Sequence, residues 1–220
     1  MDNCSDMIND HYQSITSISE GIYKEKGSKF LASAYPIQSE EDLINHIDIL
    51  KKNHPKARHF CYAYRLGVDG LLFRANDDGE PSGTAGRPIL AAIQSYQLSD
   101  VGIVVVRYFG GTKLGASGLI HAYKEAAKDS LHHAVIKDVY ITKSCKLYFN
   151  YSHMGILMEV LKSLEIDIAE KDLTTDPSFI LSIRASKFEE SIKLIKAKLL
   201  GRNPEDIDDD TTIPYCTFEL

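Results

Sequence analysis

Two glycine-rich stretches place the strongest constraint on how this chain can fold. They run from Asp77 to Pro88 and from Arg107 to Gly118, and together they hold seven of the fourteen glycines in the 220 residues. Glycine has no Cβ, so it tolerates positive φ angles and lets other backbone or a ligand approach closely. The first stretch precedes an apolar run with helical spacing, and the second joins a β-branched run to another helical pattern. We therefore expect a tight turn at each position, and any functional surface of the chain to lie there.

Composition and charge limit the possible partners. Hydrophobic residues make up 44% of the chain and charged residues 25%, as in ordinary globular domains. The net charge is −6: three acids and no Lys or Arg in residues 1–19, fourteen cations against thirteen acids in 20–135, and eleven against fifteen in 136–220. Strong non-specific binding to nucleic acid requires many cations that neutralise phosphates, so it is not expected of the whole chain. A local anion site within residues 20–135 remains open.

Targeting and metal-binding signals are weak in this sequence. No apolar run approaches the ~20 residues that span a bilayer, and the N-terminus lacks the plan of a signal peptide. We therefore expect a cytoplasmic protein without membrane contact. The cysteines form no CxxC pair, which argues against structural zinc and a disulfide framework; they are Cys4, Cys61, Cys145 and Cys216. No metal and no cofactor is expected, and the oligomeric state is left open.

Residues 20–138 are predicted to form an α/β domain, after a polar N-terminal segment of residues 1–19. Ser39, with Asp42 three residues on, is predicted to cap the start of a helix, which we expect to end before Pro55. The run Val101–Phe109 is β-branched and nearly all apolar, which is typical of a central strand covered on both faces. Further strands are expected over residues 21–36 (with a break near 27), 60–65 and 71–73, and further helices near 88–96 and over 119–132.

Residues 139–220 show a second, smaller pattern. Apolar residues alternate as in strands near 145–149, 166–168, 179–183 and 216–220, and they repeat at helical spacing over 156–164 and 188–199. The order β-α-β-β-α-β is that of a ferredoxin-like domain. The chain is therefore predicted to be α+β, with a domain boundary at 138/139.

The second glycine-rich stretch follows a strand and opens a helix, which is the geometry of an anion-binding turn. It contains neither a Walker A motif, since no Gly-Lys-Ser/Thr occurs, nor the G-x-G-x-x-G dinucleotide fingerprint. Packing and helix capping explain the glycines about as well as ligand binding does. If the stretch binds an anion, its candidate residues are Arg107, Tyr108, Gly110, Gly111, Lys113 and Gly115.

The first glycine-rich stretch carries three carboxylates, on Asp77, Asp78 and Glu80. They could hold a divalent cation through oxygen ligands, but acids in an Asp-Gly turn more often accept hydrogen bonds from local amides. His59 lies two residues from Cys61 and is a further candidate for a polar or metal site, or for a Cys–His pair. The remaining candidates for anion binding are Ser82, Gly83, Thr84 and Gly86.

The two stretches together resemble the signature of the IMPACT family, whose bacterial members are called YigZ-type proteins. The resemblance rests on residues 77–88 and on Val105–Gly115, and it covers about residues 20–135. Ser117 stands where a glycine is common in the family. The resemblance implies an N-terminal domain like the second domain of ribosomal protein S5, and a C-terminal domain like the ferredoxin-like last domain of elongation factor G. It also implies a link to translation, since eukaryotic relatives are regulators of translation.

Three functional hypotheses follow. The first is a non-enzymatic, cytoplasmic binding protein linked to translation, which contacts RNA phosphate or a ribosome-associated partner through the glycine-rich stretches. The second is an enzyme or binder of a phosphorylated small molecule, with Asp77, Asp78 or Glu80 beside the glycine turn. The third is a protein–protein interaction module. The sequence favours the first.

Overall fold

The computed structural model describes residues 10–219, and these divide into two compact units. The N-terminal unit runs from His11 to Val139, and the C-terminal unit begins at Tyr140 and includes Asp10. The fold class predicted from the sequence, α+β with an α/β domain followed by a ferredoxin-like domain, is confirmed. None of the helices in the described part of the chain is long and apolar enough to cross a membrane.

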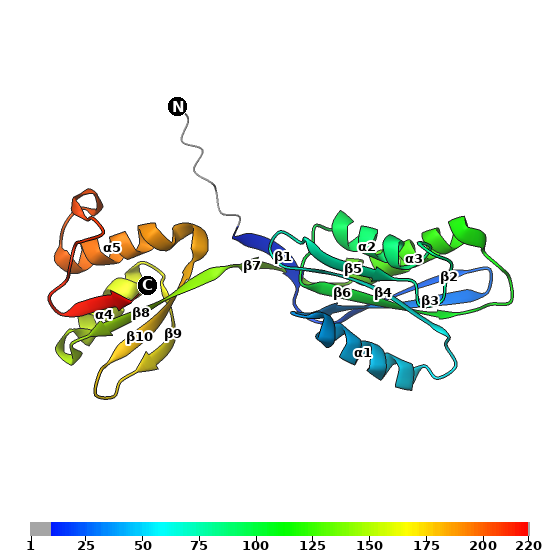
Figure 1. The fold of residues 1–220 in the computed structure, drawn as a ribbon, viewed down its shortest axis with the longest axis horizontal. Helices are drawn as coiled ribbons and strands as arrows, with labels where there is room; N and C mark the ends of the chain where they lie inside the picture. The colour runs from blue at the N-terminus through cyan, green and yellow to red at the C-terminus, as the bar shows by residue number, and fades with distance from the viewer. Residues whose placement is uncertain (1–9, 220) are drawn as a thin grey trace, which may run out of the picture. The chain divides into compact units, whose positions relative to one another are not determined.

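The N-terminal unit is built on a five-stranded antiparallel sheet with the strand order β2-β3-β6-β4-β5. One helix covers one face of this sheet and two helices cover the other (Figure 1). The strands are β2 (Ser19–Glu25), β3 (Ser28–Pro36), β4 (His59–Leu66), β5 (Leu72–Asn76) and β6 (Val101–Tyr108), and the helices are α1 (Glu40–Asn53), α2 (Gly86–Ser95) and α3 (Gly115–His132).

Strand β6 lies at the centre of the sheet, and seven of its eight residues are buried. Ile103 and Val105 contribute to the core beneath α2 and α3, whereas Val104 and Val106 contribute to the core beneath α1. This alternation explains why the strand is apolar at successive positions, and it confirms that both of its faces are covered.

Helix α1 starts and ends as its sequence indicates. Ser39 accepts a hydrogen bond from the Asp42 amide, and the Asp42 carboxylate in turn accepts from the Ser39 amide. The helix ends at Asn53, with His54 as its C-cap. Helix α3 differs, because it begins at Gly115, four residues before the predicted start.

Part of the expected N-terminal segment is structured. Residues 11–15 form a strand, β1 (His11–Ile15), that pairs with β7 (Ile136–Tyr140) in a separate two-stranded sheet. Tyr12 and Ser14 on β1 also donate hydrogen bonds to Asp100 of the N-terminal unit. Residues 1–9, which hold the first part of the predicted polar segment and Cys4, lie outside the described residues.

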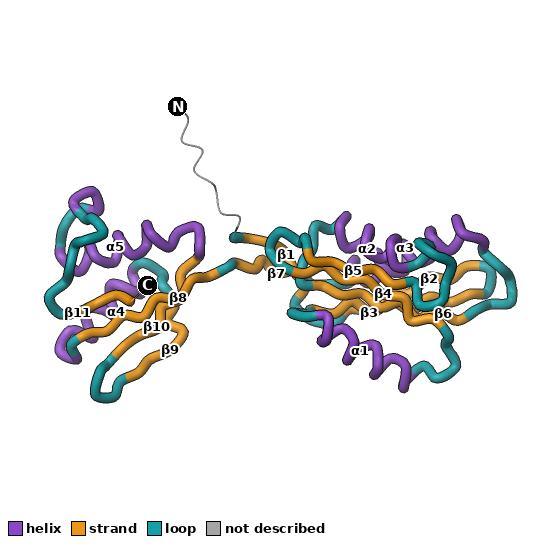
Figure 2. The backbone as a smooth tube through the Cα atoms, in the orientation of Figure 1, coloured by secondary structure: helices purple, strands orange, loops and turns teal. Residues whose placement is uncertain are grey.

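The C-terminal unit has the predicted β-α-β-β-α-β order (Figure 2). Its four strands form an antiparallel sheet in the order β11-β8-β10-β9, which is the ferredoxin-like arrangement. Alternate residues such as Leu147 and Leu181 face a core shared with both helices. The elements are β8 (Thr142–Phe149), α4 (Met154–Ser163), β9 (Asp167–Asp172), β10 (Ser178–Arg184), α5 (Phe188–Leu200) and β11 (Cys216–Glu219).

Candidate functional site

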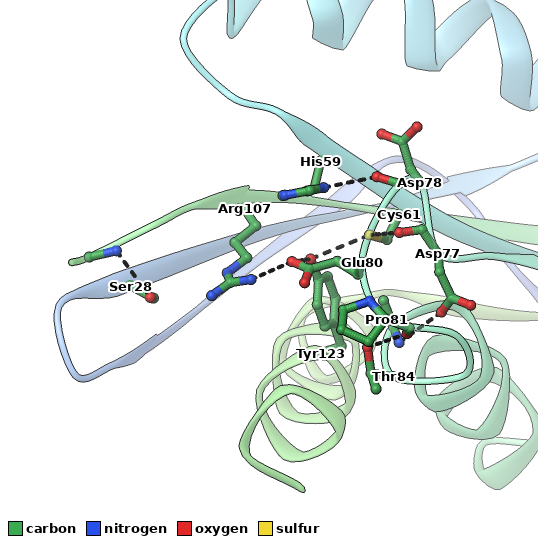
Figure 3. Close-up of polar contacts among 12 residues, drawn as sticks. Ser28, His59, Cys61, Asp77, Asp78, Glu80, Pro81, Thr84, Arg107 and Tyr123 are labelled. Atoms are coloured by element: carbon green, nitrogen blue, oxygen red, sulfur yellow. Dashed lines mark hydrogen bonds and ion pairs between the residues drawn. The ribbon is translucent and has the colours of Figure 1, made fainter. Parts of the chain in front are cut away.

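The two glycine-rich stretches meet at one end of the N-terminal sheet. Antiparallel pairing places His59 of β4 and Phe30 of β3 on either side of Arg107 in β6. The first stretch lies over this end, since the His59 ring nitrogen Nδ1 is 2.9 Å from the Asp78 carbonyl oxygen and the Phe60 amide donates to the Asp78 carboxylate at 2.6 Å. The side chains of the two stretches then contact one another directly (Figure 3).

That contact is a buried ion pair between Arg107 and Glu80. The Arg107 Nη1 atom lies 2.5 Å from Glu80 Oε1, and only 9% and 4% of the two side chains is exposed. Tyr123 of α3 donates to the same carboxylate oxygen at 2.8 Å. The guanidinium group also lies 5.5 Å from the ring centre of Phe30 and 5.6 Å from that of Phe109. Four segments of the unit are therefore held together through one arginine.

Asp77 organises the first stretch. Its carboxylate accepts hydrogen bonds from the amides of Gly83, Ala85 and Gly86 at 2.8–2.9 Å, so it caps the start of α2 from eight residues upstream of Ala85. Burial by itself would raise the pKa of Asp77, but the three amide hydrogen bonds outweigh it and hold the pKa below its ordinary value. The stretch is thus a preformed turn rather than an open loop.

Thr84 of the first stretch and Cys61 beneath it are also hydrogen-bonded within the protein. The Thr84 hydroxyl donates to the Pro81 carbonyl at 2.6 Å, and the Cys61 thiol lies 3.0 Å from the Asp77 carbonyl and 3.3 Å from the Tyr123 hydroxyl. Burial raises the pKa of the Cys61 thiol far above neutral, so it is protonated in the folded protein. Cys61 and His59 each bond to a carbonyl oxygen of the turn rather than to one another.

Carboxylates of the first stretch bind protein groups instead of converging on an empty position. Asp77 and Asp78 accept from backbone amides, and Glu80 is paired with Arg107. Among residues 10–219, no group of three or more His, Cys, Asp or Glu side chains has the arrangement of a metal site.

The second stretch is anchored at its beginning and open at its end. Gly110 packs so tightly on the β2–β3 turn that a Cβ there would lie 1.9 Å from the carbonyl carbon of Gly27. The Gly110 amide donates to the Ser28 hydroxyl at 3.1 Å. By contrast, Gly111 and Gly115 adopt positive φ angles of 87° and 72° with open space where a Cβ would stand. Helix α3 then begins without a side-chain cap and without an acid in its first turn.

The structure therefore changes the roles expected for several candidates. Arg107 is not an exposed cation, because it is buried against Glu80. Tyr108 is half-buried and its hydroxyl lies 2.9 Å from His54 Nδ1, while the amides of Gly83, Gly86 and Gly110 are already used within the protein. The candidates that remain accessible are Ser82, Gly111, Lys113 and Gly115.

Sequence reasoning missed three sets of residues at this end of the sheet. Tyr123 and Ser28 complete the hydrogen bonds that hold the two stretches, and Phe109 is 60% exposed beside them. The third set is basic and surrounds the β2–β3 turn. A signal for it was present in the sequence, since three lysines lie close to Gly27: Lys24, Lys26 and Lys29.

Eight exposed cations gather at the same end of the unit, which we call the basic end; they are Lys24, Lys26, Lys29, Lys51, Lys52, Lys56, Arg58 and Lys113. Lys29 pairs with Tyr108 across β3 and β6, and the contact of His54 with Tyr108 brings the last turn of α1 to the same place. The β2–β3 turn and the loop after β6 lie beside one another there (Figure 1). Within the described residues, none of the eight forms an ion pair.

Comparisons with known proteins show which family the chain belongs to. The Impact N-terminal domain model matches residues 26–131, which include both glycine-rich stretches. A Haemophilus influenzae protein, "IMPACT family member", is 31% identical over 180 residues, which is 80% of this chain and 87% of that protein. The chain belongs to the IMPACT family. It is also similar to IMPACT family member YvyE of Bacillus subtilis, with 36% identity over 143 residues, or 65% of this chain and 66% of YvyE.

A solved structure described as "Crystal structure of an hypothetical protein" shares the fold of this IMPACT family chain. The TM-score is 0.64 at 24% sequence identity, over 91% of this chain and 99% of that one. The elements of both units therefore occur in a known fold.

Proposed function

We propose that this IMPACT family chain is a binding protein linked to translation, which contacts RNA phosphates through the basic end of its N-terminal unit. The link to translation rests on the resemblance to a family whose eukaryotic members regulate translation. The contact with RNA rests on one observation above all: Lys24 and Lys29 lie directly opposite each other in the β2–β3 pair.

Like charges at directly opposed positions destabilise an antiparallel pair. Here the two lysines are both exposed, and Lys26 lies in the turn between their strands. A bound polyanion would turn this repulsion into attraction, because each ammonium group would then face a phosphate. The arrangement is therefore costly for folding alone and favourable for a ligand of repeated negative charge.

The second glycine-rich stretch adds donors of a different kind. The first amides of a helix have no partners within the helix and carry partial positive charge. In α3 these amides follow Gly115 with no side-chain cap, and the exposed Lys113 precedes them. A phosphate at this position would receive amide hydrogen bonds and one charge, while the lysines of the β2–β3 turn contact its neighbours along the chain.

The buried groups support binding rather than catalysis. The Thr84 hydroxyl and the Cys61 thiol both bond within the turn, and the pKa of the thiol is raised by burial. The buried contacts among Arg107, Glu80 and Tyr123 hold the first glycine-rich stretch against β6 and α3. Such a scaffold keeps the ligand-facing residues in one geometry before the ligand arrives, which lowers the entropy lost on binding.

The test is a comparison of three full-length proteins by fluorescence anisotropy with an unstructured RNA oligonucleotide. Alongside the wild type, the first variant combines Lys24→Ala, Lys29→Ala and Lys113→Ala. The control combines Lys187→Ala and Lys193→Ala, two exposed lysines of the C-terminal unit. We expect the triple variant to lose affinity about tenfold at low salt and the control to bind as the wild type does.

The triple variant should lose RNA affinity without losing thermal stability. Removing Lys24 relieves the repulsion across the strands, so we expect the triple variant to melt at or above the wild-type temperature. Absence of RNA binding by the wild type, or equal losses in the triple variant and the control, would contradict the proposal. Retention of ribosome cosedimentation by the triple variant would point instead to a ribosome-associated protein as the partner.

A further inference from the structure

Phe109 is a largely exposed aromatic side chain in the loop after β6, at the basic end. It follows β6 directly, and 60% of it is exposed. The two residues after it are Gly110 and Gly111, which carry no side chain that could cover the ring. Exposing a ring of this size sacrifices the free energy that its burial would provide.

The ring is nevertheless held in place. The Arg107 guanidinium lies 5.6 Å from its centre, and that guanidinium also contacts Glu80 and the ring of Phe30. A cation against an aromatic face is attractive and restricts the orientation of the ring. Phe109 is therefore an exposed aromatic platform supported by Arg107, with glycines and Lys113 following it in the loop.

We propose that Phe109 stacks against an RNA base, and hence that the basic end takes unpaired rather than double-helical RNA. This inference rests on the proposed function. Bases within a duplex are stacked on one another and cannot reach a protein ring, whereas unpaired bases can be turned outward. Proteins that bind single strands combine such rings with a positively charged groove along the backbone.

The residues around Phe109 favour base stacking by this ring over two alternatives, stacking by Tyr108 and docking of a protein. Tyr108 cannot serve as the platform, because it is half-buried and bonded to His54. A protein-docking patch would need further exposed apolar area around the ring. The residues that follow Phe109 are instead Gly110, Gly111, Thr112 and Lys113, and the facing turn contributes Lys26 and Gly27.

The absence of tryptophan from the sequence allows a direct test. Phe109→Trp creates a single fluorescent reporter at the platform. Phe73→Trp is the matched control, since Phe73 is 52% exposed on β5 and pairs with Arg65, at the opposite end of the sheet. Each full-length variant is titrated with an unstructured oligonucleotide and with an RNA duplex of equal length.

We expect the single strand to quench the emission of the Phe109→Trp variant saturably, the duplex to leave it nearly unchanged, and the control variant to respond to neither. Stacking of one base also predicts that Phe109→Leu lowers the affinity for the single strand about tenfold with an unchanged salt dependence, and that Phe109→Tyr retains the wild-type affinity. Equal quenching by duplex and single strand would overturn the inference.

The outcomes separate this inference from the proposed function. If the lysine variants lose RNA affinity while Phe109→Leu binds as the wild type does, the stacking role is wrong and the RNA surface stands. If the wild type binds neither RNA, the proposed function fails and the inference fails with it. If Phe109→Leu instead abolishes capture of a protein and leaves RNA affinity unchanged, the exposed ring belongs to a protein interface and the stacking role is wrong.

Discussion

Arg107 is buried, yet it holds in place the loops that form the surface at this end of the sheet. Its guanidinium is paired with Glu80 and lies near the rings of Phe30 and Phe109, and its Nε atom has no partner among the described residues. Taking both charges out of water is costly, and the pair offsets that cost only while both partners remain. Removing either one leaves a buried charge without compensation.

Glu80→Ala should therefore lower the free energy of unfolding by about 3–5 kcal/mol, as measured by urea titration. Arg107→Met should be similarly destabilised. The combination of Glu80→Met and Arg107→Met removes both charges and keeps apolar volume, so it should recover most of the stability while disordering the loop after β6. Additive losses in the double variant would show that the two side chains are not coupled.

Asp77 makes the free energy of unfolding depend on pH in the acidic range. Its pKa is lower in the folded protein than in the unfolded chain, so its stabilising effect is complete above the unfolded value of about 4 and disappears as the pH falls below it. We expect Asp77→Asn to cost about 1–3 kcal/mol at pH 7, because an amide accepts the three backbone hydrogen bonds less strongly. The difference from wild type should shrink as the pH is lowered below about 4. An equal difference at neutral and acidic pH would contradict the assignment.

At the scale of elements, the β2–β3 turn and the loop after β6 are joined backbone to backbone. Gly110 contacts Gly27 without room for a Cβ, and the Ser28 hydroxyl ties the two segments together. This contact carries Lys26 and Lys29 to the same place as the start of α3. The geometry of the basic end thus depends on the absence of one side chain.

Gly110→Ala should separate the two segments. We expect a loss of at least about 2 kcal/mol in the free energy of unfolding and a weaker affinity for RNA, since the new Cβ meets backbone that cannot move aside cheaply. Gly155→Ala is the control: a Cβ on this helical glycine would have nothing within 4 Å, so alanine should leave stability unchanged or raise it by up to about 1 kcal/mol. Equal effects of the two substitutions would exclude the close approach as the cause.

Local signals in the sequence predicted most of the elements. The capping box at Ser39 and Asp42 and the apolar run of β6 depend only on neighbouring residues, and both predictions are confirmed. The early start of α3 was missed because glycine, at positions 115 and 118, is a poor helix former. The start is set instead by the turn that Gly115 makes with its positive φ angle.

The site was less predictable, because it depends on strand register. That Arg107 meets Glu80, 27 residues away, follows from the pairing of β4 with β6 and from the turn that Asp77 fixes. Nothing in the residue types distinguishes such a buried arginine from an exposed one. The glycine pattern therefore predicted a candidate surface at this end of the sheet, whereas the identity of its exposed residues required the fold.

Across the whole molecule, positive and negative charges are unevenly distributed. It carries −6 overall, yet the basic end of the N-terminal unit gathers eight exposed cations without ion pairs in the described part of the chain. The acidic excess belongs to residues 1–19 and 136–220. The electrostatic potential at the basic end is therefore expected to attract a polyanion more strongly than the acidic C-terminal unit does.

The most direct test of RNA binding at the basic end is a titration of the ¹⁵N-labelled full-length protein with unstructured RNA, followed by the chemical shifts of its backbone amides. We predict that the largest changes fall on Lys26, Gly111, Lys113 and the first turn of α3, and that amides of α5 remain where they were. Changes confined to residues 140–219, or no changes at RNA concentrations well above those of the protein, would contradict this prediction.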